Sequence, residues 1–154
     1  MSKSRTALLL LSALLLLSAL FFGFFQGKNK SAGDYFKDWF KVPPPAGANC
    51  SEFHTNEARE NDWVFAVKFQ DQAQSKAFFS TWSLDKGTPG KNIIFKNLKA
   101  IISGTQFEKD LVKQGWSMVP SSYDVYEGKM KNGKEFLVYL SVGGERMLVL
   151  IPGG

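Results

Sequence analysis

The only thiol and the only imidazole of the chain, Cys50 and His54, lie four residues apart. Such a pair can act as a nucleophile with its general base, or can supply two ligands to a metal ion. A structural zinc site needs four ligands, however, and a Cys/His hydrolase takes its two residues from separate segments around a cleft. We therefore interpret residues 49–62, which are polar and locally acidic, as a solvated loop without a catalytic residue or a metal.

Carboxylates offer a second route to catalysis, because a glycosidase needs only two of them, held at a set separation. The candidates are Glu108, Asp110, Asp124, Glu127, Glu135 and Glu145. Their separation in space does not follow from their spacing along the chain. A small extracytoplasmic hydrolase is therefore the less favoured class of function, and we expect neither an enzyme nor a cofactor.

Lysines form the one locally basic patch of the predicted domain: Lys96, Lys99, Lys109 and Lys113. Such a patch is usually a solvated face, and the alternative is a binding surface for an acidic partner. Residues 1–41 hold six Lys/Arg against two Asp/Glu, whereas residues 42–154 hold thirteen against twelve. The pI of 9.3 is thus mostly a property of the N-terminal segment, which favours anionic lipid as a contact and not nucleic acid.

The element that must position everything else is Ala7–Phe25, nineteen residues without a charge. As a helix rising about 1.5 Å per residue it spans roughly 28 Å, close to the thickness of a hydrocarbon core. A cleaved signal peptide also begins with basic residues, here Lys3 and Arg5, but its apolar region is usually about 7–15 residues long and ends at small residues. This run is longer and ends in phenylalanines, so we predict a retained transmembrane signal-anchor over residues 1–27.

Two features of the anchor disagree about its orientation. More lysines come after the apolar run than before it, which favours a cytoplasmic C-terminal side. An N-terminal apolar segment, on the other hand, commonly acts as a signal-anchor that exports the domain on its C-terminal side. We expect a single-pass membrane protein with its C-terminal domain on the extracytoplasmic, periplasmic side.

Residues 28–48 are expected to form a short interfacial helix and a stiff spacer. Four aromatic residues fall on one side of this helix: Tyr35, Phe36, Trp39 and Phe40. A helix this short does not persist alone in water, so it needs a surface. We predict that the four rings lie at the bilayer surface; the alternative is that they pack on the globular domain or on a neighbouring subunit. Pro43–Pro45 ends the helix and forms the spacer.

Residues 49–154 are enough for one domain with a modest core and too few for two. Trp63–Phe69 is apolar on both faces, which predicts a central strand. Asp71 is a helix-capping residue for a segment that runs towards Gly87. Thr105-Gln-Phe-Glu108 is a capping box that begins a second helix, which ends near Gly115.

Residues 93–103 allow two interpretations. Their apolar residues have helical spacing, yet the segment is rich in isoleucine and immediately precedes the capping box. We predict a strand there, with a helix as the alternative.

The C-terminal third predicts an antiparallel β-meander. Four strand-like runs come one after another: Trp116–Val119, Tyr123–Met130, Glu135–Val142 and Glu145–Ile151. Asn132-Gly133 and Gly143-Gly144 are typical of two-residue type I′ hairpin turns. The fold class is therefore α+β, with two helices covering one face of an antiparallel sheet.

Together these patterns predict a membrane-anchored, non-catalytic interaction domain, acting as an accessory or assembly subunit of a membrane protein complex. Its expected partners are the bilayer and another membrane protein. The alternative function is binding of an envelope polymer or of anionic lipid through the four lysines of the basic patch. One cysteine excludes an internal disulfide.

Overall fold

The computed structural model describes residues 30–55, 61–86 and 91–153, with the side chains of 91–96 left out. Within these ranges, no helix has both the length and the apolar character needed to cross a membrane. The predicted anchor, Ala7–Phe25, lies outside the described residues. One compact unit runs from Ala32 to Gly154, so it includes both the aromatic helix and the proline segment after it.

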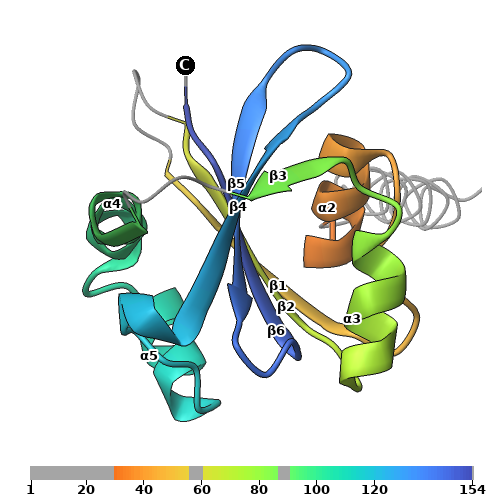
Figure 1. The fold of residues 1–154 in the computed structure, drawn as a ribbon. Coiled ribbons are helices and arrows are strands. Elements are labelled where there is room, and N and C mark those ends of the chain that lie inside the picture. Colours follow the sequence, from red (N-terminus) through yellow and green to blue (C-terminus); the bar gives the residue numbers. More distant parts are fainter. Residues whose placement is uncertain (1–29, 56–60, 87–90, 154) are drawn as a thin grey trace, which may run out of the picture. The chain divides into compact units, whose positions relative to one another are not determined.

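A six-stranded antiparallel sheet forms the centre of the domain (Figure 1). Its strands are β1 (Asn49–His54), β2 (Trp63–Lys68), β3 (Leu84–Lys86), β4 (Tyr123–Lys129), β5 (Glu135–Ser141) and β6 (Arg146–Ile151). Their order across the sheet is β1-β2-β6-β5-β4-β3, with every neighbouring pair antiparallel. The predicted α+β class and the meander of β4, β5 and β6 are confirmed.

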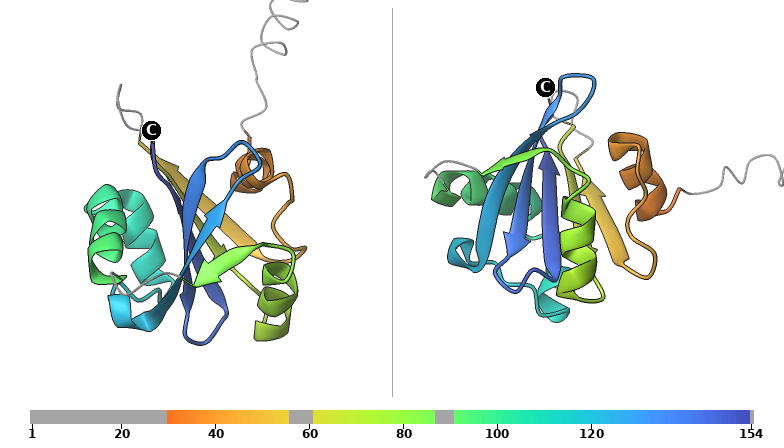
Figure 2. Two further views of the ribbon diagram at one scale, coloured as in Figure 1. Left: turned by 45° about the horizontal axis from the view of Figure 1, so that its top comes forward. Right: turned by 45° about the vertical axis from the view of Figure 1, so that its right-hand side comes forward.

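Helices cover both faces of this sheet. They are α2 (Ala32–Phe40), α3 (Gln72–Phe79), α4 (Lys91–Ile102) and α5 (Gln106–Lys113), with one short 3-10 helix, η1 (Pro120–Ser122). Figures 1 and 2 show α4 and α5 on one side of the sheet and α2 and α3 on the other. The prediction that the helices cover a single face is therefore wrong.

The two central strands explain this arrangement, because successive side chains of a strand point to opposite faces. In β2, Val64 and Ala66 are buried in the core beneath α4 and α5, whereas Phe65 and Val67 are buried in the core beneath α2 and α3. All five residues Met147–Ile151 of β6 are also buried. A sheet that is apolar on both faces needs a helical layer on each side.

The aromatic helix α2 packs on the domain. Phe36 is fully buried, with its ring centroid 4.6 Å from that of Phe40 and 5.4 Å from that of Phe65. Tyr35, Trp39 and Phe40 are partly buried against the same core. The alternative of packing on the domain is therefore the observed one, and the expectation that Phe36 lies at the bilayer surface is wrong, because its ring fills a gap between α2, α3 and the sheet.

Residues 93–102 belong to the helix α4, so the strand predicted over 93–103 is wrong. Leu98 and Ile102 are fully buried, and Ile101 packs against the same core, as their helical spacing requires. The β-branched residues carry only a small intrinsic cost in a helix, and burial of this face outweighs it. Local propensity and tertiary packing disagreed in this segment, and packing decided the structure.

The helices α3 and α5 begin as their capping residues predict. Asp71 accepts a hydrogen bond from the backbone N–H of Gln74 at 2.7 Å, although α3 ends earlier than expected, at Phe79. Thr105 accepts from the backbone N–H of Glu108 at 3.1 Å. The Glu108 carboxylate reaches back to the N–H of Gly104, one residue before its usual partner in a capping box.

Trp116–Val119 is not a strand, contrary to the prediction. The N–H of Trp116 donates to the carbonyl of Leu111 at 3.0 Å, and the N–H of Gly115 donates to that of Val112 at 2.9 Å. Gly115 has a φ of 78°, so the segment ends α5 in a Schellman motif. The ring of Trp116 is then buried beside Leu111, which ties the segment to a helix end and not to a neighbouring strand.

The hairpin positions are confirmed, but their turn type is not I′. Gly133 and Gly144 have φ values of 85° and 73°, whereas neither Asn132 nor Gly143 has a positive φ. The N–H of Gly133 donates to the carbonyl of Met130 at 2.9 Å, and the N–H of Gly144 donates to that of Ser141 at 2.7 Å. Each turn thus ends in a left-handed glycine, as in hairpins with a glycine bulge.

We predict that Phe36→Ala lowers the free energy of unfolding by about 3–5 kcal/mol, because it removes a fully buried ring and leaves a cavity. The matched control is Lys37→Ala, which changes the exposed neighbour and is expected to stay within about 0.5 kcal/mol of the parent. Urea unfolding followed by tryptophan fluorescence measures both variants. Equal stability of the two would show that α2 does not belong to the cooperative core.

Candidate functional site

Cys50 and His54 lie on the edge strand β1, so the predicted solvated loop is wrong for residues 49–54. Two residues four positions apart on a strand are separated by about 13 Å, with side chains on the same face. This distance is too long for a thiol to pass its proton to an imidazole, or for both to bind one metal ion. Burial, with a smaller contribution from Glu52, also raises the pKa of the Cys50 thiol from 9.0 to about 12.

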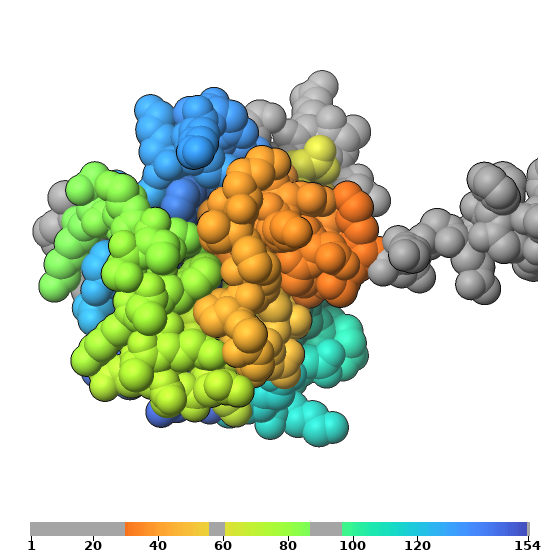
Figure 3. Space-filling view, turned by 90° about the vertical axis from the view of Figure 1, so that its right-hand side faces the viewer, coloured from red at the N-terminus to blue at the C-terminus, as the bar shows by residue number. Residues whose placement is uncertain are grey.

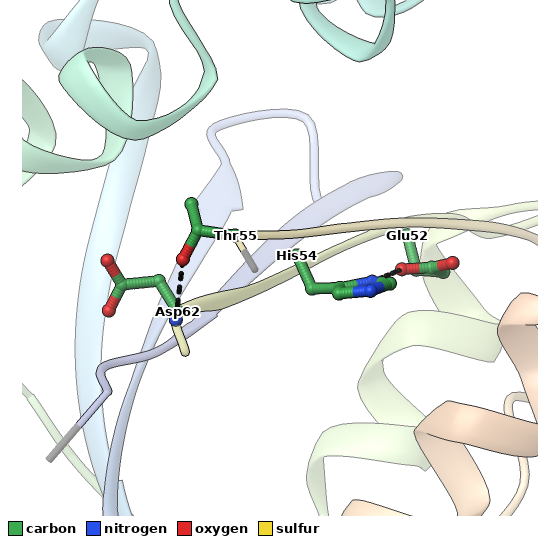
Figure 4. A network of polar contacts seen from close by, with 4 residues as sticks. All are labelled: Glu52, His54, Thr55 and Asp62. Carbon is green, nitrogen blue, oxygen red and sulfur yellow. Dashed lines mark hydrogen bonds and ion pairs between the residues drawn. The ribbon is translucent and has the colours of Figure 1, made fainter. Parts of the chain in front are cut away.

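The imidazole of His54 has a different set of neighbours. Its Nδ1 atom lies 3.1 Å from a carboxylate oxygen of Glu52 (Figure 4). Its ring stacks on that of Trp63, with a centroid distance of 4.4 Å. In the same region Thr55 accepts from the backbone N–H of Asp62 at 3.0 Å. The Asp62 carboxylate accepts from the N–H of Gly153 at 2.6 Å, which ties the end of β6 to the start of β2.

The predicted lysine patch is only partly described. Lys99 on α4 and Lys109 and Lys113 on α5 are exposed, while the side chain of Lys96 lies outside the described part of the chain. Lys109 and Lys113 are four residues apart and therefore share a face of α5. Glu108 and Asp110 occupy the same helix, so its charges are mixed.

Two of the six candidate carboxylates come together. Glu127 and Glu135 line one cavity of about 470 Å³, which Asp85 also borders. All three residues are exposed, and Lys129 lines the same cavity. A glycosidase acid is normally held in surroundings that raise its pKa, usually by burial. The arrangement therefore does not favour these carboxylates as an acid and base pair.

The site that the sequence did not predict is a pocket of about 330 Å³ at the end of α2, which we call the aromatic–basic pocket. Three separate segments line it: residues 39–41, residues 81–83 and the β4–β5 hairpin. Figure 3 shows these segments meeting on one face of the molecule. Its lining residues are Trp39, Phe40, Lys41, Thr81, Trp82, Ser83, Lys129, Met130, Lys131, Asn132 and Phe136.

Aromatic rings form one part of this pocket. The rings of Phe40 and Trp82 stack with centroids 4.8 Å apart, and Phe136 meets them edge-on at 5.1 and 5.4 Å. Phe136 is the cross-strand partner of Gly128, and a Cβ atom at that glycine would overlap its ring. The glycine therefore leaves the space that the Phe136 ring occupies.

Lysines form the other part. Lys41, Lys129 and Lys131 are exposed, and no carboxylate is among the residues that line the pocket in the described part of the chain. Lys41 has a φ of 61°, a left-handed conformation that usually favours glycine at a helix end. Its Nζ atom donates to the carbonyl of Asp38 at 2.7 Å, which caps α2 with a positive charge.

A second cavity of about 450 Å³ adjoins this pocket, since Trp39 lines both. Tyr35, His54 and Trp63 also line the second cavity. The Nζ atom of Lys134 lies 5.1 Å from the centroid of the Trp39 ring, a cation–π contact. The cationic surface thus continues along the hairpin, past the rim of the aromatic–basic pocket.

One signal for this pocket was available in the sequence. Lys129, Lys131 and Lys134 fall within six residues around the Asn132-Gly133 turn, and a hairpin carries such residues together. Lys41 and the rings of α2 gave no comparable signal, because only the packing of Phe36 brings them to the hairpin. Comparisons of the chain with protein-family models, with curated proteins and with solved structures found no match.

We predict that Cys50 reacts with iodoacetamide at pH 8 at least about tenfold more slowly than a cysteine in an unfolded peptide does. The reason is that only the thiolate is nucleophilic. The pKa is raised by folding, so the thiol stays protonated until the pH approaches about 12. Mass spectrometry of the alkylated protein, with and without urea, measures both rates. Fast alkylation of the folded protein at pH 8 would contradict a partly buried thiol that stays protonated at that pH.

Proposed function

We propose that this protein is a membrane-anchored, non-catalytic binding domain whose aromatic–basic pocket receives an anionic group of its partner. The observation that carries the proposal is the convergence of Lys41, Lys129 and Lys131 on one pocket without a carboxylate among its described lining residues. Like charges gathered in a hollow with aromatic walls repel one another, and a bound anion relieves that repulsion.

The proposed anchor would place the pocket near a membrane. Ala7–Phe25 is separated by six residues from α2, and α2 supplies Trp39, Phe40 and Lys41 to the pocket. A retained anchor would therefore keep the pocket close to a membrane surface, on the extracytoplasmic side under our proposal. Anionic groups available there are lipid phosphates, envelope polymers and acidic surfaces of membrane proteins.

We predict that the triple change Lys41→Glu, Lys129→Glu and Lys131→Glu weakens binding of inorganic polyphosphate by at least about tenfold, because it reverses the charge of the rim. Isothermal titration calorimetry on the full-length protein in a nonionic detergent measures the affinity.

The matched control reverses the same number of exposed lysines on the other face of the sheet, Lys99, Lys109 and Lys113. This control is expected to bind polyphosphate within about twofold of the parent. If the control loses binding and the pocket variant keeps it, the anion site lies on α4 and α5, and the pocket proposal is wrong.

A second candidate function is that of an accessory or assembly subunit of a membrane protein complex, which the edge strand β1 favours. The N–H of Thr55 donates to the carbonyl of Asp62 at 3.0 Å, and bonding alternates along an antiparallel pair. Ser51 and Phe53 therefore pair with β2, whereas Cys50, Glu52 and His54 direct their backbone groups towards the outer edge. A strand of a membrane protein partner can add to such an edge.

We predict that Glu52→Pro abolishes co-purification of a membrane protein partner in gentle detergent, because it removes an N–H on the outer side of β1 while edge strands tolerate proline. The matched control is Glu52→Ala, which loses the same carboxylate but keeps the N–H. Thermal unfolding checks that both variants remain folded. Equal recovery of the partner with the two variants would rule out strand addition at β1.

A further inference from the structure

We propose that the anionic partner of the aromatic–basic pocket is a phospholipid of the membrane that holds the anchor. The phosphate lies between Lys41, Lys129 and Lys131, and the apolar part next to the phosphate lies against the rings. This inference rests on the proposed function and names its ligand.

The composition of the pocket favours an amphiphile over a free anion. Its walls include the Phe40 and Phe136 rings, which offer no hydrogen bond to an isolated phosphate but provide apolar contact for a hydrocarbon chain, as does the ring face of Trp82. Met130 adds a flexible thioether that adapts to an irregular chain. A ligand that satisfies both parts of the pocket has a charged head joined by a short link to an apolar body.

The size of the pocket limits how much of a lipid it holds. A volume of about 330 Å³ lies at the lower end of the range for small-molecule sites, roughly 300–1,000 Å³. It has room for a phosphate, the glycerol and the first carbons of an acyl chain, and the rest of the chain has to stay in the bilayer. A long polymer would need a groove open at both ends.

The covalent chain supplies the ligand at high local concentration. Residues 26–31 number six, and six residues reach at most about 20 Å when fully extended. If the anchor is retained, this short connection makes lipid headgroups the most abundant anionic groups within reach of the domain. Lys37, exposed on α2, and Lys134, beside Trp39, add positive charge that an anionic leaflet attracts.

The test uses the full-length protein labelled with fluorotryptophan in nanodiscs. The chain has four tryptophans: Trp39 and Trp82 line the pocket, Trp63 lines the adjoining cavity, and Trp116 is buried on the opposite face of the sheet. On replacing part of the phosphatidylcholine by phosphatidylglycerol, we expect the fluorine resonances of Trp39 and Trp82 to shift in a saturable way. The Trp116 resonance is the internal control and should not move.

Variants connect the shift to the lysines. Lys41→Ala with Lys131→Ala should raise the phosphatidylglycerol content needed for half of the shift by at least about tenfold, whereas Lys99→Ala with Lys113→Ala should leave it within about twofold. An equal loss in both pairs would mean general attraction to the leaflet, and would overturn the inference.

Two further additions separate the sources of the anion. Glycerol phosphate added to phosphatidylcholine nanodiscs should not shift the Trp39 and Trp82 resonances at concentrations below about 1 mM. If it does shift them at such concentrations, the ligand is a soluble phosphate, and the proposal of a lipid ligand is wrong. If polyphosphate shifts the Trp39 and Trp82 resonances but phosphatidylglycerol does not, the proposal of a lipid ligand is wrong, whereas the proposed anion site is supported. If no anion shifts the Trp39 and Trp82 resonances, the proposed anion site and the proposed lipid ligand are both wrong.

Discussion

The packing of Phe36 between α2, α3 and the sheet is the interaction on which the candidate site depends. Its ring lies within 6.1 Å, centroid to centroid, of Phe40, Phe65, Phe78 and Trp82. Two of these neighbours, Phe40 and Trp82, are also walls of the aromatic–basic pocket. The same contacts therefore join the segment after the predicted anchor to the core and form the pocket. Burial of such a ring contributes roughly 2–3 kcal/mol to the free energy of folding by its apolar area alone. The same burial therefore holds the walls of the pocket in place.

Those parts of the fold that depend on neighbouring residues could be predicted from the sequence. The strand β2 begins with five consecutive apolar residues, Trp63–Val67, because both its faces are covered, and the meander results from strands separated by glycine turns. The helices α3 and α5 start at the caps Asp71 and Thr105. Each cap side chain accepts a hydrogen bond from the backbone N–H three residues later. In each case the decisive contact lies within a few positions along the chain.

The errors came where a distant contact decided the structure. Residues 93–102 are part of α4 because Leu98 and Ile102 are buried against the sheet, and the isoleucine content of the segment did not reveal that. The turn at Asn132-Gly133 has the expected residues but a different distribution of positive φ. Residues 49–54 were expected in a solvated loop, yet they form the edge strand β1 by pairing with β2. The pocket was missed for the same reason, since Lys41 and Lys131 meet only after α2 has packed.

The pocket also breaks two local rules of sequence and structure, and both exceptions serve its geometry. Lys41 adopts a left-handed conformation, which costs an ordinary side chain about 1 kcal/mol where glycine costs nothing. Gly128 lies within the strand β4, where a glycine is unfavourable by roughly 0.5–1 kcal/mol relative to alanine. The first exception places a cation at the rim, and the second leaves room for the Phe136 ring in its wall. Both exceptions are consistent with a pocket that binds an anionic, partly apolar ligand.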